Sequence, residues 1–406
     1  MMEAHSLKLV RLKHVSWLNM GQSPPSSEYT DSPDAGLPFL QGTADFGDVY
    51  PTPQVYCPTP NKVADKDDIL ISVRAPVGEL NIADQRYGIG RGLCAVKCGR
   101  KLDREFAWWA LHWSREQLAL KATGSTYEAV ALEDIADILL PSISIEQQQV
   151  IAKSLGEKTA VIDQLITAKE RLITLLDEKR RALITHAVTR GLDTAVPLRD
   201  SGVEWIGRVP EHWETEFARW LLREIDVRSE TGAEELLSVS HITGVTPRSE
   251  KDVNMFMAQS LEGYKVCQPG DLVINTLWAW MGAMGVSFQE GIVSPSYHVY
   301  RPGNKLNPKY LDYLVRLPVF ATEVNRYSKG VWSSRLRLYP QEFFQIGLPI
   351  PPLVEQEEIV HYLEQETEKL DNLKNALQKT ITLLQERRTA LIAAAVSGQH
   401  PVAVQS

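Results

Sequence analysis

The sequence predicts an α+β protein in which two globular units are joined by two long helices that form an antiparallel coiled coil with pseudo-two-fold symmetry. Three observations predict it: a repeated segment, a seven-residue spacing of leucines within that segment, and a shared order of short strands before each copy. Residues 140–190 align without a gap with residues 348–398 at a constant offset of 208, and roughly 20 of 51 positions are identical. The predicted boundaries are therefore 1–139 and 195–347 for the globular units, and 140–194 and 348–406 for the helices.

Each repeated segment has the pattern of a long amphipathic helix. Apolar residues recur every seven positions over about four heptads, which is typical of a coiled coil. Ser144 and Gln147 form a capping pair at the start of the first helix, and Gly191 and Gly398 are suitable stops. Lys169 interrupts the first seam. The predicted seam residues are Leu155, Ile162, Leu165, Leu172, Leu176, Leu183, Leu363, Leu370, Leu377, Leu384 and Leu391.

The order of the segments predicts how the helices pair. The first helix leads from the first globular unit to the second, and the second helix starts at the second unit, so pairing within the chain requires antiparallel helices. Acidic residues early in the second helix would face the basic residues 179–181 of the first. The same charges also complement each helix dipole, and both effects are small.

The two globular units share one order of parts. Asp68–Val73 and Leu93–Lys97 have the composition of short strands, and a helix is expected over Asp103–Ala122. In the second unit Asp271–Asn275 and Tyr297–Arg301 match the two strands, and a helix follows from Leu306. The whole chain is therefore expected to be a duplication.

Composition excludes several classes of protein. The net charge of −8 argues against a general polyanion binder, so any nucleic-acid contact must come from local basic patches. There is no apolar run long enough for a membrane span and no signal-like start, so a cytoplasmic protein without membrane contact is expected. The cysteines lack metal-site spacing and are expected to be free, buried thiols: Cys57, Cys94, Cys98 and Cys267.

No catalytic motif is recognisable. Phosphate-binding glycine loops, nucleophile elbows, paired zinc histidines and calcium loops are missing from the sequence, so neither an enzyme nor a cofactor or metal site is expected in this chain. What remains is polar and aromatic loop material near predicted strand ends, of types that contact bases and phosphates. The candidate DNA-binding residues are Gln41, Thr43, Arg74, Arg91, Ser125, Thr126, Tyr127, His241, Thr243, Asn275, Trp278, Trp332, Ser333, Arg335 and Arg337.

The repeat resembles a known family. The stretches LPIPPLVEQEEIV (348–360) and RRTALIAAAVSG (387–398), with their counterparts LPSISIEQQQVI (140–151) and KRRALITHAVTRG (179–191), are similar to the helices of type I restriction–modification specificity subunits. SGVEWIGRVPEHWE, from Ser201, also resembles the start of a target recognition domain of this family. The central copy departs from the pattern where Ser142, Ile143 and Ser144 replace the prolines.

The resemblance implies a function. Each globular unit would be a target recognition domain that reads one half of a bipartite, asymmetric site in double-stranded DNA. The helices would set the spacing and dock two methyltransferase subunits, which use S-adenosylmethionine to methylate adenine at N6. Restriction–motor subunits, which use ATP and Mg, would complete the complex. A coiled-coil scaffold with two protein-binding ends is the alternative, and a self-sufficient methyltransferase is a third reading that the missing motifs disfavour.

Overall fold

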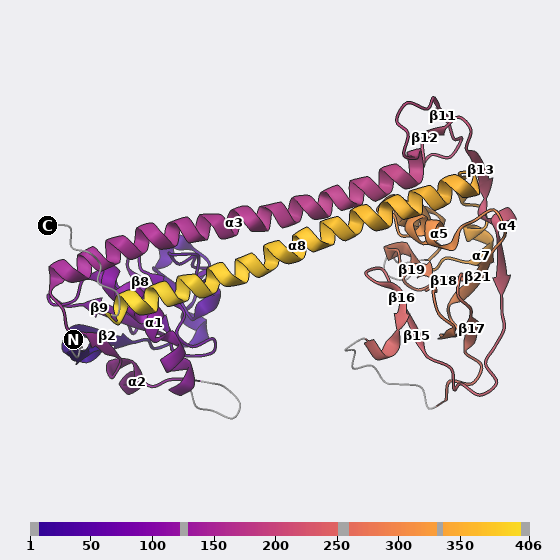
Figure 1. Cartoon of the computed structure of the whole chain (residues 1–406). Coiled ribbons are helices and arrows are strands. Elements are labelled where there is room, and N and C mark those ends of the chain that lie inside the picture. Colours follow the sequence, from indigo (N-terminus) through magenta and orange to yellow (C-terminus); the bar gives the residue numbers. More distant parts are fainter. Residues whose placement is uncertain (1–7, 122–128, 251–259, 331–335, 399–406) are drawn as a thin grey trace. The chain divides into compact units, whose positions relative to one another are not determined.

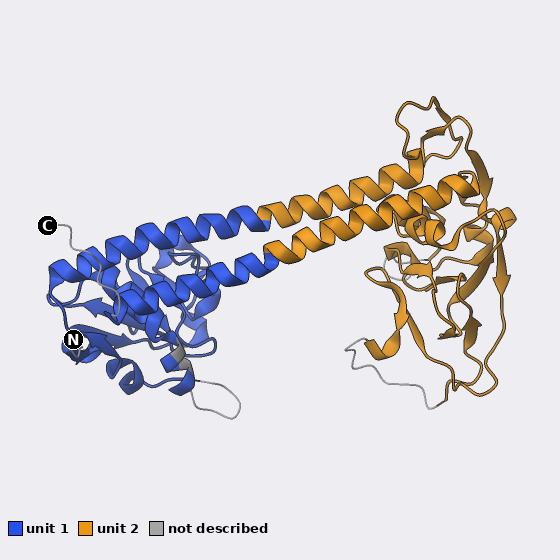
Figure 2. Cartoon of the chain, in the orientation of Figure 1, with its two compact units in different colours: residues 1–170, 378–406 blue, residues 171–377 orange. Residues whose placement is uncertain are grey.

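A computed structural model describes residues 8–121, 129–250, 260–330 and 336–398. The chain divides into two compact units, shown in Figure 2: unit 1 comprises residues 1–170 and 378–406, and unit 2 comprises residues 171–377. Each unit therefore contains one globular part together with a stretch of both long helices. The division falls inside the two long helices.

The two repeated segments form the helices α3 (Ile145–Arg190) and α8 (Leu353–Val396), labelled in Figure 1. The predicted capping pair is present, since the Ser144 amide donates to Gln147 Oε1 at 3.1 Å and the Gln147 amide donates to Ser144 Oγ at 3.3 Å. Gly191 and Gly398, each just beyond its helix end, have φ of 77° and 69°. Such left-handed backbone favours glycine and ends a helix, as predicted.

Unit 1 contains two four-stranded sheets. The first is antiparallel in the order β2-β9-β6-β7, and the second, in the order β4-β3-β8-β5, includes one parallel pair, β3 with β8. A separate ladder pairs β1 with β10. The elements are β1 (Leu9–Arg11), β2 (Ser16–Met20), β3 (Leu37–Leu40), β4 (Val55–Cys57), β5 (Val63–Ala64), β6 (Ile69–Ser72), β7 (Leu80–Ile82), β8 (Tyr87–Ile89), β9 (Leu93–Cys98), α1 (Arg104–Lys121), α2 (Leu132–Ala136) and β10 (Leu139–Pro141).

Unit 2 repeats this framework. Its four-stranded antiparallel sheet has the order β14-β21-β18-β19, and β13 pairs with β22 as β1 pairs with β10. Three further hairpin-like pairs are β11-β12, β15-β16 and β17-β20. The elements are β11 (Leu198–Asp200), β12 (Arg208–Pro210), β13 (Glu214–Phe217), α4 (Ala218–Leu221), β14 (Leu222–Ile225), β15 (Leu237–Ser240), β16 (Gly244–Pro247), β17 (Lys265–Cys267), β18 (Leu272–Ile274), β19 (Met284–Val286), β20 (Gly291–Val293), β21 (His298–Pro302), α5 (Pro308–Val315), α6 (Pro318–Tyr327), α7 (Pro340–Phe343) and β22 (Gly347–Ile350).

The strands that the sequence predicts to be equivalent occupy equivalent places. β6 and β18 are the strands expected at Asp68–Val73 and Asp271–Asn275, and each pairs with the strand expected next, β9 or β21. The helix expected over Asp103–Ala122 is α1. The duplication therefore extends through the globular parts, where sequence identity is low.

A buried glutamine joins the unit 1 globular part to α3. Gln148 is 3 % exposed. Its Oε1 accepts from the Asp103 amide at 2.8 Å, and its Nε2 donates to Lys101 O at 3.0 Å and to Ile143 O at 3.1 Å. The side chain thus satisfies backbone groups on both sides of the joint.

Unit 2 repeats this joint at the equivalent position of α8. Gln356 is fully buried. Its Oε1 accepts from the Asn307 amide at 2.8 Å, and its Nε2 donates to Lys305 O and Pro351 O, both at 2.8 Å. The repeat is therefore kept hydrogen bond by hydrogen bond as well as in sequence.

Both long helices contribute to the core of each unit. In unit 1, Leu155 of α3 and Val396 of α8 pack with Phe106 of α1 in one buried cluster. In unit 2, Val188 of α3 and Leu363 of α8 belong to the cluster around Trp213 and Tyr310. Tyr310 also donates its hydroxyl to Val188 O at 2.9 Å. Burial of these large side chains is the main stabilising term in each unit.

Within each unit the two helices run side by side in opposite directions, as Figure 1 shows. In unit 2, Arg180 Nη1 lies 2.9 Å from Asp371 Oδ1, and Lys374 Nζ lies 2.8 Å from Asp177 Oδ1. In unit 1, Arg388 Nε lies 2.8 Å from Asp163 Oδ1. The Asp163–Arg388 and Asp371–Arg180 pairs are equivalent under the repeat, and the antiparallel pairing predicted from topology is confirmed.

The predicted seam residues differ in how far they are exposed to solvent. The seam leucines and Ile162 are buried or half-buried, and Lys169 is half-buried among them. Leu165 and Leu172 are also predicted seam residues, but they are 46 % and 48 % exposed. Their positions place them on the outer surface, because Ile166 and Ile173 occupy the intervening seam positions instead.

Two predictions from composition can also be compared with the structure. The four cysteines are free thiols, with Cys57, Cys94 and Cys267 buried and Cys98 half-buried. Among the described helices, none combines the length and the apolar character needed to cross a membrane.

Candidate nucleic-acid interface

In unit 1, three predicted residues gather where β6 ends and β9 begins, a place called here the β6–β9 end. Arg74 follows β6 and forms an isolated bridge with Ala129. The Val73 amide donates to Gly92 O at 2.9 Å, which brings Arg74 close to the turn containing Arg91. Gln41 adjoins the same turn, because a Cβ added to Gly92 would lie 2.3 Å from its carbonyl oxygen.

These three side chains are available to a ligand. Gln41, Arg74 and Arg91 are exposed, and the structure gives neither arginine an ion pair within its described ranges. Two exposed guanidinium groups next to an amide form a local basic patch on an acidic chain. Such a set can contact phosphates and base edges.

Thr43 lies apart from that patch. It is half-buried in a short 3-10 helix (Thr43–Asp45) and lines a cavity of about 670 Å³ with Trp108, Trp109 and His112. The Asp163–Arg388 pair of the long helices also lines this cavity. Burial, reinforced by Arg388, lowers the pKa of His112 to about 4, so its imidazole is neutral at pH 7.

In unit 2 the equivalent place is where β18 ends and β21 begins, called here the β18–β21 end. The Leu338 amide donates to Thr276 O at 3.3 Å, as the Val130 amide donates to Val73 O at 3.0 Å in unit 1. Arg337 directly precedes Leu338 and is exposed. In the described part of unit 2 it has no carboxylate partner.

Trp278 borders the same end. It is 51 % exposed and stacks on Trp280 with ring centroids 6.2 Å apart. The indole therefore presents apolar surface beside Arg337's loop, an arrangement suited to contact with a sugar or a base.

His241 and Thr243 lie elsewhere, in the tight turn between β15 and β16. Both are exposed. Ser240 Oγ accepts from the Thr243 amide at 3.1 Å and lies 2.9 Å from Thr243 Oγ1, so the threonine hydroxyl stabilises the turn. His241 is the better placed of the two for an external contact.

Asn275 has an internal role. It is 5 % exposed; its Nδ2 donates to Tyr297 Oη at 3.0 Å and its Oδ1 accepts from the Leu277 amide at 3.3 Å. An amide whose groups are bonded inside the unit does not present a base-reading edge. The prediction that Asn275 contacts DNA directly therefore does not fit its placement, and the side chain instead supports the Leu277–Trp278 segment.

The remaining candidates lie outside the described residues: Ser125, Thr126, Tyr127, Trp332, Ser333 and Arg335.

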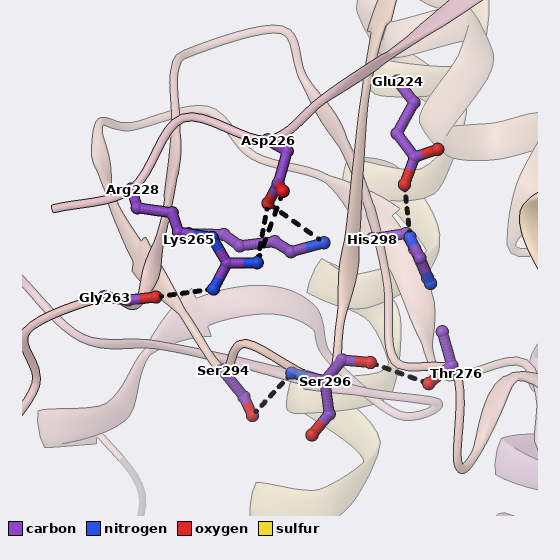
Figure 3. Close-up of polar contacts among 9 residues, drawn as sticks. All are labelled: Glu224, Asp226, Arg228, Gly263, Lys265, Thr276, Ser294, Ser296 and His298. Carbon is purple, nitrogen blue, oxygen red and sulfur yellow. Dashed lines mark hydrogen bonds and ion pairs between the residues drawn. The ribbon is translucent and has the colours of Figure 1, made fainter.

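Sequence reasoning missed a polar cluster that Figure 3 shows in unit 2. His298 Nδ1 lies 2.5 Å from Glu224 Oε1, and Thr276 Oγ1 donates to Ser296 O at 2.7 Å. Nearby Lys265, 4 % exposed, lies 3.6 Å from Asp226. Burial raises the pKa of Asp226, but Lys265 and Arg228 outweigh it and keep the pKa below its usual value. The contacts join residues far apart in sequence, so no local motif marks them.

The similarity of this chain to a known protein family extends over both halves of the duplication. A family model described as the type I restriction modification DNA specificity domain matches residues 6–175 and 268–383. Over 171 residues the chain is 39 % identical to a protein of Methanocaldococcus jannaschii assigned as the specificity subunit of the type I restriction enzyme MjaX, covering 42 % of this chain and 39 % of that protein. A type I specificity subunit assigned in Mycoplasma pneumoniae is 29 % identical over 123 residues, covering 30 % of this chain and 33 % of that protein. The chain thus spans less than half the length of these two relatives.

Two solved structures share the fold. One, described as the structural basis of complex assembly and conformational transition of the type I R-M system, superposes with a TM-score of 0.75 at 17 % identity and covers 98 % of this chain and 100 % of that one. The HsdS subunit from Thermoanaerobacter tengcongensis gives a TM-score of 0.57 at 17 % identity, covering 98 % of both chains. With the matched regions of the family model spanning most of the sequence, the chain belongs to the family of type I restriction–modification specificity subunits.

Proposed function

We propose that this chain reads a bipartite, asymmetric site in double-stranded DNA, with one half-site bound by each unit. The observation that carries the proposal is the pair of equivalent sheet ends with exposed arginines that form no ion pair among the described residues: Arg74 and Arg91 in unit 1, and Arg337 in unit 2. The frameworks are alike, whereas the side chains mounted on them differ. Two units with the same backbone framework but different exposed side chains are suited to recognising two different DNA sequences.

The long helices would hold the two readers at a set spacing and dock two adenine-N6 methyltransferase subunits. The repeat places leucine at exposed, equivalent positions of both helices: Leu165 with Leu373, and Leu175 with Leu383, all between 42 % and 63 % exposed. Unit 1 contains Leu165 and Leu383, and unit 2 contains their equivalents. Each unit therefore displays the same two leucines, as two identical partners would require.

The chemistry would belong to the partners. The methyltransferase subunits would supply S-adenosylmethionine, and restriction–motor subunits would use ATP and Mg. In this chain the described side chains form no cluster of three or more histidine, cysteine or carboxylate groups able to hold a metal. The role of this chain would be to place the partners on DNA.

Methylome sequencing tests the function directly. A host that expresses this chain with its partner methyltransferase should gain adenine methylation at one two-part motif, and the same host without the chain should lack it. Methylation without a common motif, or an unchanged methylome, would contradict the proposal. Gel shifts of the assembled complex on random DNA would then separate a reader from a scaffold, because a scaffold would show no sequence preference.

A further inference from the structure

We infer that the β18–β21 end of unit 2 is a phosphodiester seat, in which Arg337, His298 and Ser296 hold one phosphate of the target DNA and fix the reading register. Arg74 and Arg91 would hold a phosphate of the other half-site at the equivalent end of unit 1. The inference rests on the proposed function and deepens it, because it assigns to these residues a positioning role and not base recognition.

The seat in unit 2 is a cavity of about 210 Å³. Its polar walls come from Ser296, His298, Arg337 and Tyr339, while Thr276 and Leu338 are buried beneath. A cavity of this size admits a phosphate with part of its sugar, but a base pair could not enter it. Tyr339 is 49 % exposed, so its ring borders the opening.

The Arg337 guanidinium and the hydroxyls of Ser296 and Tyr339 line the cavity and can donate hydrogen bonds to a ligand. Behind the cavity the Glu224 carboxylate lies 2.5 Å from His298 Nδ1, which orients the imidazole ring (Figure 3). Arg337 has no ion pair in the portion of the chain that the structure describes. Phosphate oxygens only accept hydrogen bonds, so a donor-rich wall complements them, whereas adenine and cytosine also require acceptors.

The seat is rigid because three chain segments are hydrogen-bonded to one another around it. Thr276 Oγ1 donates to Ser296 O at 2.7 Å, and the Ser296 amide donates to Ser294 Oγ at 3.3 Å (Figure 3). On the other side the Leu338 amide donates to Thr276 O. Residues 276, 296 and 338 are thereby held together before any ligand arrives, which reduces the entropic cost of binding.

The β6–β9 end of unit 1 supports the inference independently. There the Val73 amide donates to Gly92 O at 2.9 Å and the Val130 amide donates to Val73 O at 3.0 Å, so the same three segments meet. Basic side chains again lie at this end of the sheet. Arg74 and Arg91, however, are not at the positions equivalent to Arg337 and His298. Positive charge is therefore present at the equivalent end of both sheets, although different residues supply it. This is expected if each unit must contact the DNA backbone.

The test is salt-dependent DNA binding by the complex of the full chain with its methyltransferase. Affinity is measured by fluorescence anisotropy on the methylome-derived target duplex and on a scrambled duplex. Arg337→Ala should weaken binding to both duplexes by a similar factor, and the slope of log K against log salt should fall in magnitude by about one. Arg337→Lys should retain the slope because it keeps the charge. Arg223→Ala is the matched control, since strand alternation points this exposed residue away from the Glu224 face.

Single neutral methylphosphonate substitutions then locate the phosphate. The unsubstituted protein should bind more weakly to the duplex that carries the neutral linkage at one position of one half-site. The Arg337→Ala variant should not be weakened further by the neutral linkage at that position. Arg91→Ala should remove sensitivity at a position in the other half-site. An unchanged salt slope in Arg337→Ala, or a loss confined to the target duplex, would overturn the seat; the second result would assign Arg337 to base reading. If the unsubstituted complex showed no preference for the target, the proposed function itself would fail, which is a separate outcome.

Discussion

Gln148 and Gln356 show how a single residue type can define a joint. Each amide bonds three backbone groups, two of them in the globular part and one in the loop before the helix. Glutamine fits because it offers an acceptor and two donors on one flexible stem. Glutamate could accept but could not donate to the two carbonyl oxygens.

Replacing either glutamine should destabilise its own unit. Gln148→Ala leaves one amide and two carbonyl groups without their partner, and an unsatisfied buried group costs about 1–3 kcal/mol. We expect a fall of about 2–4 kcal/mol in the free energy of unfolding, measured by urea denaturation, with a similar loss for Gln356→Ala. Gln149→Ala, at an exposed neighbour, is the control. Equal stability of the Gln148 and Gln149 variants would contradict the joint.

His112 gives unit 1 a pH dependence. Its pKa is about 4 in the folded chain because of burial and Arg388, against a usual value of about 6.5. Between these values the unfolded chain binds a proton that folded His112 does not, so stability decreases as pH falls from about 6.5 to 4, by up to about 1.4 kcal/mol per pH unit. Above pH 6.5 this effect is absent.

The pH effect is measured by thermal denaturation across this range. His112→Gln should reduce the fall in melting temperature between pH 6.5 and pH 4, because the titrating group is removed. His14→Gln, which alters an exposed histidine, should leave the fall unchanged. Identical pH profiles for the original chain and His112→Gln would refute the assignment.

At the scale of elements, the paired helices combine an apolar seam with polar positions at fixed places. Asp163 faces Arg388 and Asp371 faces Arg180, and these groups are roughly half exposed. Half-exposed ion pairs contribute little stability, about 0.2–1 kcal/mol each. Their greater effect is on register, because a shifted alignment would separate both pairs at once.

A charge exchange tests the register. Asp163→Arg should lower the free energy of unfolding by up to about 1 kcal/mol, because two arginines then face each other. The double variant Asp163→Arg, Arg388→Asp should recover most of the loss, and the coupling energy is read from the double-mutant cycle. A cycle on Glu366 and Lys369, which pair within α8, is the control for charge effects inside one helix. No recovery would mean that the pair does not fix the register.

The exposed leucines should matter for partners and not for folding. Leu165→Ala with Leu373→Ala should reduce capture of the methyltransferase while changing the free energy of unfolding by no more than about 0.5 kcal/mol. Leu377→Ala, in the buried seam, should instead cost about 2–5 kcal/mol. Pull-down and denaturation of the three proteins distinguish the roles. Unimpaired capture by the double variant would remove these leucines from the docking surface.

The sequence predicted the elements well and the candidate site unevenly, for reasons visible in particular residues. The repeat and its period located α3, α8 and their ion pairs, because periodicity is a local property of the chain. It misplaced Leu165 and Leu172 because heptad spacing does not by itself decide between neighbouring positions. Asn275 was assigned by residue type, yet its burial depends on Tyr297, and the Glu224–His298 contact depends on strand pairing across 74 residues.

For the whole molecule, the proposed spacer function predicts that longer helices change the DNA target. Inserting one heptad after Glu170 and another after Thr380 preserves the seam and the ion-pair register in both units. Seven residues add about 10.5 Å, equivalent to about three base pairs. Methylome sequencing should then show the same two half-sites with a longer gap, whereas a heptad inserted in one helix alone should disrupt pairing and methylation. An unaltered gap would show that the helices do not set the spacing.

The discontinuous make-up of unit 1 has a consequence for how the protein is made. Unit 2 is a single stretch, residues 171–377, whereas the unit 1 core includes Ile392, Ala395 and Val396 from the far end of α8. Although its globular part is synthesised first, unit 1 cannot complete its core until the last helix has been translated. We therefore expect the second half of the chain to reach its native state before the first, and Leu155 to stay exposed to chaperones and proteases through most of synthesis.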